Sequence, residues 1–238
     1  MLNAFFNGRK DLFEGLAVYG DHDWNSSYPV IYLDFSAMDV NNVQNFSASL
    51  NSEIVNIGRR YAIEIDEKLP LYPAERQELD SLPSNDDTKL GRLMSQLTQN
   101  WKQEHSVVVL IDEYDYPKRR NSPLYHRYNP IALDSMMSWD TFLNPFFYEL
   151  ERVKRFIKFS FLTCTAKVAY HYRIKYYPDT PVTLKDLTLD PQYSKMMGLT
   201  GAELRSHLKP HITAMISQPN ETFYTLSLIH ISEPTRPY

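Results

Sequence analysis

The segment VVVLID, residues 107–112, constrains the fold of this chain more than any other feature. It has no alternation of polar and apolar residues, and such strands are typical of parallel sheets that helices cover on both faces. The run leads directly into Asp112 and Glu113, and Asp115 follows closely. Neighbouring carboxylates repel one another and need a positive partner. We therefore predict a buried parallel strand with a charged ligand site at its carboxyl end.

Two further apolar segments, 29–34 and 156–162, predict short strands. Amphipathic helices are expected where apolar residues recur at helical spacing. This occurs over residues 2–16, with an interruption at Gly8, over 43–65, 88–104 and 141–155, and from Thr200 onward. The segments 66–87 and 114–130 contain many polar residues and prolines, so we expect exposed connections there. Strands that alternate with helices predict an α/β architecture.

The composition excludes some classes of protein. The 238 residues, 43% hydrophobic, suffice for one sizeable domain. A net charge of -4 gives no global electrostatic attraction to nucleic acid or to an anionic membrane. No apolar run approaches the ~20 residues that a membrane span needs. Because Cys164 is the single cysteine, no intrachain disulfide can form, and we expect a cytoplasmic location.

An apolar parallel strand that ends in Asp-Glu is typical of the Walker B motif of nucleotide hydrolases. In such a site Asp112 would hold Mg²⁺, directly or through water. Glu113 would orient and deprotonate the attacking water. The metal would then be the positive partner of the clustered carboxylates. The alternative is a strand followed by an acidic turn, because this short pattern also arises by chance.

Several separated blocks of the sequence resemble, in the same order, the AAA-ATPase-like family of bacterial P-loop proteins. The blocks lie within residues 1–211 and read LNAFFNGRKDLFEGLAV, YPVIYLDFS, VVVLIDEYDYP, FIKFSFLT and LKDLTLDPQYSKMMGLTGAEL. The family's Asp-Glu-Tyr-Asp-x-Pro signature is matched by Asp112, Glu113, Tyr114, Asp115 and Pro117. The resemblance implies a three-layer P-loop NTPase-like fold, a parallel sheet flanked by helices. It also implies that segment 107–112 lies between segments 29–34 and 156–162.

The resemblance also implies roles for individual residues. The family's sensor strand ends in Thr-Gly, which corresponds here to Thr163 and Cys164. Thr163 is therefore expected to hydrogen-bond the γ-phosphate or the attacking water. On this basis Glu113 and Thr163 are the candidate catalytic residues, Asp112 and Thr163 the candidate ATP-binding residues, and Asp112 the candidate Mg²⁺ ligand.

The phosphate-binding loop of that family, G-x-x-x-x-G-K-[ST], does not occur in the sequence. None of the seven glycines is followed by Lys-Ser or Lys-Thr. We therefore expect a fragment of a Mg²⁺- and ATP-dependent parent protein that lacks the P-loop strand. By itself the fragment should be inactive and bind neither ligand. Its strand over residues 156–162 should then have one unpaired edge.

The C-terminal segment LSLIHISEPTR, residues 226–236, does not match the family. It resembles the conceptual translation of a sequencing-library adapter. The expected organisation is a partial AAA-ATPase-like domain over residues 1–225 and a non-native tail over residues 226–238.

Two other classes of function stay open. A Mg²⁺-dependent nuclease would use Asp34, Asp112 and Glu113 as a carboxylate cluster around shared metal ions. Asp34 is more simply interpreted as a cap for the loop after its strand. A partner-binding module with a degenerate nucleotide site would account for the missing P-loop lysine and for Cys164.

Two weaker patterns have simpler interpretations. Lys118, Arg119 and Arg120 alternate with tyrosines and could contact a nucleic-acid backbone, as could Arg127. A solvated loop beside the cleft is favoured, and nothing in the sequence supports Arg119 or Arg120 as an arginine finger. The second pattern is a pair of histidines at positions 207 and 211, spaced like zinc ligands. Because Pro210 interrupts that helix, surface histidines are favoured.

Overall fold

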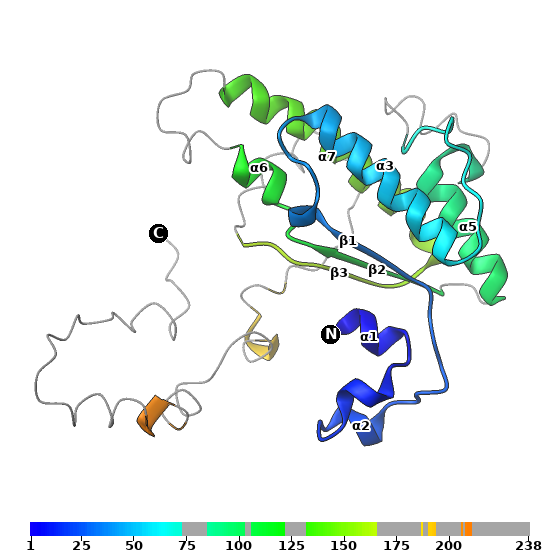
Figure 1. Cartoon of the computed structure of the whole chain (residues 1–238), viewed down its shortest axis with the longest axis vertical. Helices are drawn as coiled ribbons and strands as arrows, with labels where there is room; N and C mark the ends of the chain where they lie inside the picture. The colour runs from blue at the N-terminus through cyan, green and yellow to red at the C-terminus, as the bar shows by residue number, and fades with distance from the viewer. Residues whose placement is uncertain are drawn as a thin grey trace, which may run out of the picture. The chain divides into compact units, whose positions relative to one another are not determined.

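The computed structural model describes residues 1–72, 85–102, 106–121, 132–165, 187, 190–193, 206 and 208–210. The chain divides into two compact units, Met1–Val182 and Thr183–Tyr238. In the second unit, the described residues include the short helix η6 (Pro191–Tyr193). The first unit contains the sheet and the candidate site (Figure 1). The proposed tail over residues 226–238 lies outside the described residues.

Three parallel strands form the sheet of the first unit. They are β1 (Val30–Asp34), β2 (Val107–Asp112) and β3 (Ile157–Leu162), in the spatial order β1-β2-β3. The three predicted strands and the central place of the apolar one are confirmed. Asp34 pairs in register with Asp112, and Ile111 pairs with Leu162. The carboxyl ends of all three strands therefore meet at one edge of the sheet.

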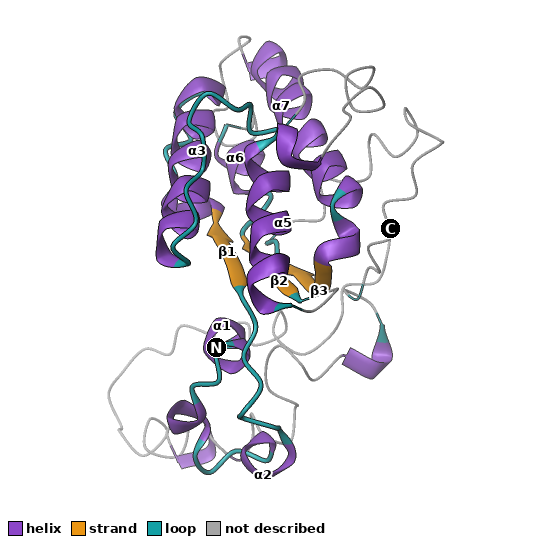
Figure 2. Ribbon diagram, turned by 90° about the vertical axis from the view of Figure 1, so that its right-hand side faces the viewer, coloured by secondary structure: helices purple, strands orange, loops and turns teal. Residues whose placement is uncertain are grey.

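Three long helices cover one face of this sheet. Figures 1 and 2 show α3 (Val43–Arg60), α5 (Lys89–Trp101) and α7 (Ala132–Arg152) on the same side of the strands. Each helix carries an apolar stripe that it buries against the strands, as the helical spacing predicts. The fully buried core residues include Ile31, Leu33, Phe46, Leu50, Ile54, Leu93, Leu97, Val109 and Phe146.

A shorter segment covers the opposite face. The helix α1 (Leu2–Phe6) contacts β1 and β2, and Phe6 packs on a small buried cluster of Val30, Val108 and Leu110. The chain continues through η1 (Lys10–Phe13) and α2 (Val18–Asp21) before it enters β1. Helices therefore lie on both faces of a parallel sheet, which confirms the α/β fold class (Figure 1).

Two predicted helices end earlier than their patterns suggest. The first ends at Phe6, and the interruption expected at Gly8 is confirmed, because Gly8 has a positive φ of 69°. The second, expected over 43–65, ends at Arg60 because the chain turns at Ala62, whose φ is 56°. Ile65 then returns to pack on Gly58, where an added Cβ would lie 2.9 Å from Cγ1 of the isoleucine. Ile63 and Ile65 are therefore buried without being helical.

The prediction of a loop over residues 114–130 is wrong in its first part. A short helix, α6, spans Tyr116–Arg120, and the residues after 121 lie outside the described part. Pro117 stands in the first turn of α6, where a missing N–H breaks no helical hydrogen bond and the fixed φ favours helix initiation. Proline there begins a helix rather than preventing one.

The other helix predictions differ mainly in their bounds. α7 begins at Ala132, before the expected residue 141, and continues past Pro145; η4 (Lys154–Phe156) follows it. η2 (Phe35–Ala37) and η3 (Asn85–Asp87) are additional short helices. Of the helix expected after Thr200, only 206 and 208–210 are described, and all are helical.

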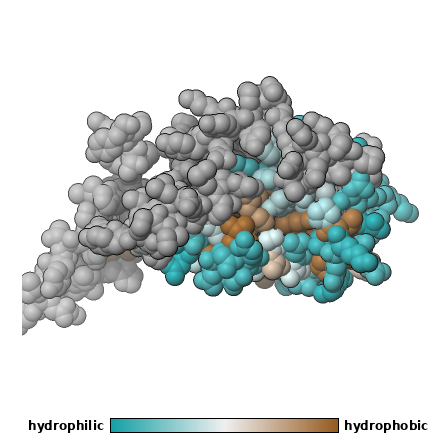
Figure 3. Space-filling view, turned by 90° about the horizontal axis from the view of Figure 1, so that it is seen from above, coloured by the Kyte–Doolittle hydropathy of each residue, from teal (hydrophilic) through white to brown (hydrophobic). Residues whose placement is uncertain are grey.

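The described surface combines hydrophilic and apolar regions. Seen from above, an apolar strip lies between hydrophilic side chains (Figure 3). Within the described sheet β3 is an edge strand, and its Phe159 side chain is 38% exposed. Among the described helices, none has the length and apolarity required to cross a membrane.

Candidate functional site

The candidate site lies where β2 and β3 end side by side. Backbone pairing continues beyond the strands, because the Thr163 N–H donates to the carbonyl of Ile111 at 2.9 Å. The Tyr114 N–H in turn donates to the carbonyl of Thr163 at 3.1 Å. These two hydrogen bonds fix the residues after β3 against the residues after β2. They explain why Thr163 lies beside the Asp-Glu pair.

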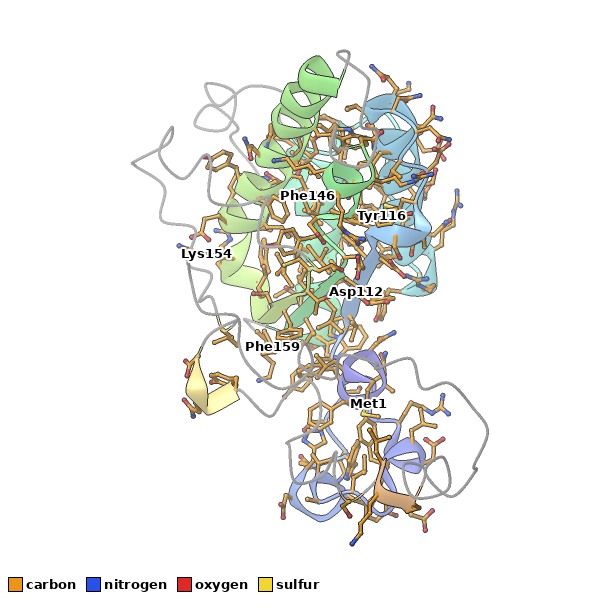
Figure 4. The ribbon with its side chains drawn as sticks, turned by 90° about the vertical axis from the view of Figure 1, so that its left-hand side faces the viewer. Met1, Asp112, Tyr116, Phe146, Lys154 and Phe159 are labelled. Carbon is orange, nitrogen blue, oxygen red and sulfur yellow. The ribbon has the colours of Figure 1, made fainter. Side chains whose placement is uncertain are left out.

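Asp112 and Thr163 are in direct contact. The Thr163 hydroxyl donates a hydrogen bond to Oδ1 of Asp112, and the Glu113 N–H donates to the same oxygen at 3.1 Å. The Glu113 N–H also lies 3.4 Å from Thr163 Oγ1. Figure 4 marks Asp112, which is half-buried at the end of β2. The structure thus brings together all three residues that the sequence identifies as site candidates.

Glu113 has an unusual backbone conformation. Its φ is 52°, in the left-handed region, which costs a residue with a side chain about 1–2 kcal/mol. The Thr165 hydroxyl donates to both Glu113 carboxylate oxygens, at 2.9 and 3.1 Å. Arg119 forms an ion pair with the Oε2 oxygen. The side chain is 32% exposed, so solvent still reaches it.

Arg119 is a positive partner of the clustered carboxylates. Its Nε donates to Oδ2 of Asp115 at 3.2 Å, and its Nη2 donates to Glu113. Asp115 is only 2% exposed, and its Oδ1 accepts a hydrogen bond from the Thr165 N–H at 3.3 Å. The sequence interpretation gave a metal this role and assigned Arg119 to a solvated loop. The i, i+4 spacing of Asp115 and Arg119 around a helix-starting proline was the available signal.

Asp34 acts as a cap, as its simpler interpretation predicts. Its Oδ1 accepts hydrogen bonds from the Ser36 N–H at 2.9 Å and from the Ser36 hydroxyl at 2.6 Å. Although Asp34 is in register with Asp112, the described residues contain no group of three His, Cys, Asp or Glu side chains that could hold a metal. The carboxylate cluster that a nuclease needs therefore gains no support within this part of the chain.

The pKa of Tyr32 reflects both burial and the negative charge at this edge of the sheet. Burial raises the pKa of the Tyr32 phenol, and the negative charges of Asp34 and then Asp112 raise it further. Tyr32 and Leu110 pair in register, two positions before the two aspartates. The phenol therefore shares its sheet face with both carboxylates.

Other candidates either lie outside the described residues or stay untested. Arg127 and the histidines at 207 and 211 are outside the described ranges. Cys164 is exposed and follows Thr163 directly. Lys118 and Arg120 belong to the last turn of α6.

The fold and site define an α/β protein whose parallel sheet ends in acidic and hydroxyl-bearing side chains at one edge. A family model described as "AAA-ATPase_like: Predicted AAA-ATPase" matches residues 1–172. The chain therefore belongs to the AAA-ATPase-like family, and the resemblance is confirmed over residues 1–172. The block LKDLTLDPQYSKMMGLTGAEL lies beyond the matched residues. Neither the curated proteins nor the solved structures contain a match to the chain.

Proposed function

We propose that this edge of the sheet is the metal-binding and water-activating part of a Mg²⁺-dependent ATP-hydrolysis site of the P-loop NTPase class. The observation that carries the proposal is the contact between Asp112 and Thr163 directly beside Glu113. Membership in a family described as predicted AAA-ATPases supports ATP as the nucleotide.

The chemistry of Asp112 suits Mg²⁺. This ion prefers oxygen ligands and keeps several waters, so one or two carboxylates are enough to hold it. Oδ1 of Asp112 is already oriented by Thr163 and by the Glu113 N–H. The second oxygen, Oδ2, accepts no hydrogen bond within the described residues and could face the metal. When bound, Mg²⁺ would offset negative charge on the β- and γ-phosphates.

Glu113 is the proposed general base. A water molecule attacks the γ-phosphorus, the bond from that phosphorus to the bridging oxygen of ADP breaks, and Glu113 takes the proton from the water. Thr163 can donate its hydroxyl either to Asp112 or to a phosphate oxygen. It therefore links the metal ligand to the reacting group.

The test is phosphate release from ATP. Because no G-x-x-x-x-G-K-[ST] loop occurs in the 238 residues, the assay uses the protein produced from the complete gene. The 238-residue chain is the comparison and is expected to be inactive, since backbone amides and the lysine of that loop hold the phosphates. We expect Mg²⁺-dependent hydrolysis that Glu113→Gln lowers at least ~100-fold.

Matched variants sharpen this test. Asp112→Asn should weaken the dependence on Mg²⁺, because it removes the charged metal ligand. Glu67→Gln is the control, since that side chain is 78% exposed and its ion pair with Arg59, at 3.7 Å, contributes little. No hydrolysis by the gene product, or full activity in Glu113→Gln, would contradict the proposal.

A further inference from the structure

The N-terminal segment, residues 1–28, carries most of the large apolar side chains that solvent reaches. The described part of the chain exposes seven such side chains, and five of them belong to this segment: Met1, Leu2, Leu12, Leu16 and Tyr19. Leu12 is 55% exposed and Leu16 is 46% exposed. Single exposed leucines are common on protein surfaces, but a local concentration of them is typical of an interaction site.

Other side chains fill the interior of this segment. Phe13 is 3% exposed, and the centre of its ring lies 5.8 Å from that of Phe5 and 5.0 Å from that of Trp24. The Trp24 Nε1–H donates to the carbonyl of Tyr19 at 2.9 Å. Packing within the segment therefore does not account for the apolar side chains that it exposes.

The exposed side chains after α1 lie on consecutive turns of the backbone. The Leu16 N–H donates to the carbonyl of Phe13 at 3.0 Å, and the Tyr19 N–H donates to the carbonyl of Leu16 at 2.9 Å. The Lys10 ammonium lies 4.6 Å from the centre of the Tyr19 ring, so η1 and α2 are in contact. We define the N-terminal face by five residues: Leu12, Glu14, Leu16, Tyr19 and Asp21.

The surroundings of these apolar side chains are acidic. Residues 9–23 contain two cations and four carboxylates, so with histidine neutral the net charge is two minus four, or -2. Arg9 pairs with Asp11 at 2.8 Å. Glu14 and Asp21 have no hydrogen bond or ion pair to their side chains within the described residues. Two unpaired carboxylates beside exposed leucines favour a partner with both apolar and positively charged side chains.

We propose that the N-terminal face is a docking surface for a basic amphipathic segment of another protein, which presents apolar side chains with lysine or arginine beside them. Leu12 and Leu16 would contact the apolar side chains, and Glu14 and Asp21 would select the positive charge. A second copy of the chain suits the face less well, because a twofold interface pairs a surface with itself and would bring like charges together. An anionic membrane would repel the face in the same way. The inference is independent of the proposed ATP hydrolysis.

The probe is a fluorescent peptide about 14 residues long, with leucines at helical spacing and lysines between them. Fluorescence anisotropy measures its binding to the 238-residue chain without nucleotide. One comparison peptide has the same composition in scrambled order, and the other has glutamate in place of lysine. We expect the leucine–lysine peptide to bind at least about tenfold more tightly than either, and to bind more weakly as salt is added.

Charge reversal is the sharpest variant. Glu14→Lys combined with Asp21→Lys should weaken binding of the leucine–lysine peptide about tenfold or more and should give the leucine–glutamate peptide the higher affinity. Glu64→Lys combined with Glu67→Lys is the matched control, because both side chains are exposed, lie outside the N-terminal face and change the net charge equally. This control should keep the original preference.

Leu12→Ser combined with Leu16→Ser tests the apolar part of the face. Loss of both side chains should weaken binding of the leucine–lysine peptide about tenfold. Because both side chains are exposed, urea denaturation should give an unchanged free energy of unfolding.

Three results would overturn the proposal. The first is equal binding of the three peptides, and the second is a charge-reversal variant that keeps the original preference. Equal weakening in the Glu64 and Glu67 control is the third, because overall charge rather than the N-terminal face would then bind the peptide. Analytical ultracentrifugation without peptide tests the second copy as occupant. A concentration-dependent dimer that the double serine variant cannot form would mean that the face pairs with itself, and it would also overturn the proposal.

Discussion

The hydroxyl of Thr163 donates a hydrogen bond to the carboxylate of Asp112, although the two residues lie 51 positions apart in the sequence. The parallel pairing of β2 and β3 makes this contact possible, because both strands end at the same edge. The proposed metal ligand and the proposed phosphate sensor are thereby coupled. A substitution of either side chain should therefore alter the position of the other.

Thr163→Val is expected to weaken Mg²⁺ use rather than ATP recognition. The variant keeps the shape of the side chain but removes the donor that orients Asp112. Loss of a group that orients a metal ligand typically costs about 10–100-fold in metal affinity or activity. Titration of ATP hydrolysis with Mg²⁺ measures the shift, and Thr163→Ser should restore the original curve. An unchanged Mg²⁺ requirement in Thr163→Val would show that the contact does not matter.

Gly58→Ala should destabilise the fold. The added Cβ would lie 2.9 Å from Cγ1 of Ile65 and 3.0 Å from the carbonyl oxygen of Ile63. Overpacking of this kind costs about 1–3 kcal/mol in the free energy of unfolding. Urea denaturation measures it. Gly20→Ala is the control, because a Cβ added at Gly20 would meet nothing within 4 Å, and a loss of equal size there would refute the packing argument.

Thr88→Val tests a buried polar contact between helices. The Thr88 hydroxyl accepts the Gly91 N–H at the start of α5 and donates to the carboxylate of Glu149 on α7, and both residues are fully buried. The valine variant loses the hydrogen bond that caps α5 and the donor to the buried Glu149 carboxylate. Its free energy of unfolding should therefore fall by about 2–3 kcal/mol. Thr88→Ser keeps the hydroxyl and should lose much less. Equal unfolding free energies for the valine variant and the original chain would count against this account.

Tyr72 should make the fold sensitive to alkaline pH. Burial raises the pKa of its phenol well above the ordinary value near 10, and its hydroxyl donates to the carbonyl of Phe142 at 2.8 Å. The folded state therefore favours the neutral phenol. This stabilisation is complete below about pH 10 and is lost above it at about 1.4 kcal/mol per pH unit, because only the unfolded chain ionises there.

The comparison with Tyr72→Phe isolates this effect from the other tyrosines. At pH 7 the phenylalanine variant should be less stable by about 1 kcal/mol, the typical value of one hydrogen bond. Above pH 10 its free energy of unfolding should fall less steeply than that of the original chain. Identical slopes in urea denaturation between pH 9 and 11.5 would mean that Tyr72 is not held neutral by burial.

The central strand could be predicted from the sequence because a strand buried on both faces consists of consecutive apolar residues. Val107–Asp112 has no polar residue before Asp112, so only a covered, central position suits it. Helix ends were harder to predict, because Ile63 and Ile65 continue an apolar pattern while they pack as a returning loop. Periodicity indicates which residues are buried but does not show where the backbone turns.

The candidate site was predictable only in part. Asp112 and Glu113 follow from the strand pattern, whereas the role of Thr163 came from the family resemblance. The ion pairs of Arg119 with Glu113 and Asp115 were missed because Pro117 favoured a loop interpretation. The left-handed φ of Glu113 has no sequence signal, because tertiary contacts rather than a glycine impose it.

The state of the nucleotide held by Glu113→Gln tests the central claim most directly. The protein from the complete gene, with and without this substitution, is incubated with Mg²⁺ and ATP, separated from free nucleotide, denatured and analysed by chromatography. Our account predicts that the unsubstituted protein retains ADP and that Glu113→Gln retains intact ATP, because binding persists while water activation is lost. ADP on the substituted protein in the same proportion as on the original, or no bound nucleotide on either protein, would contradict it.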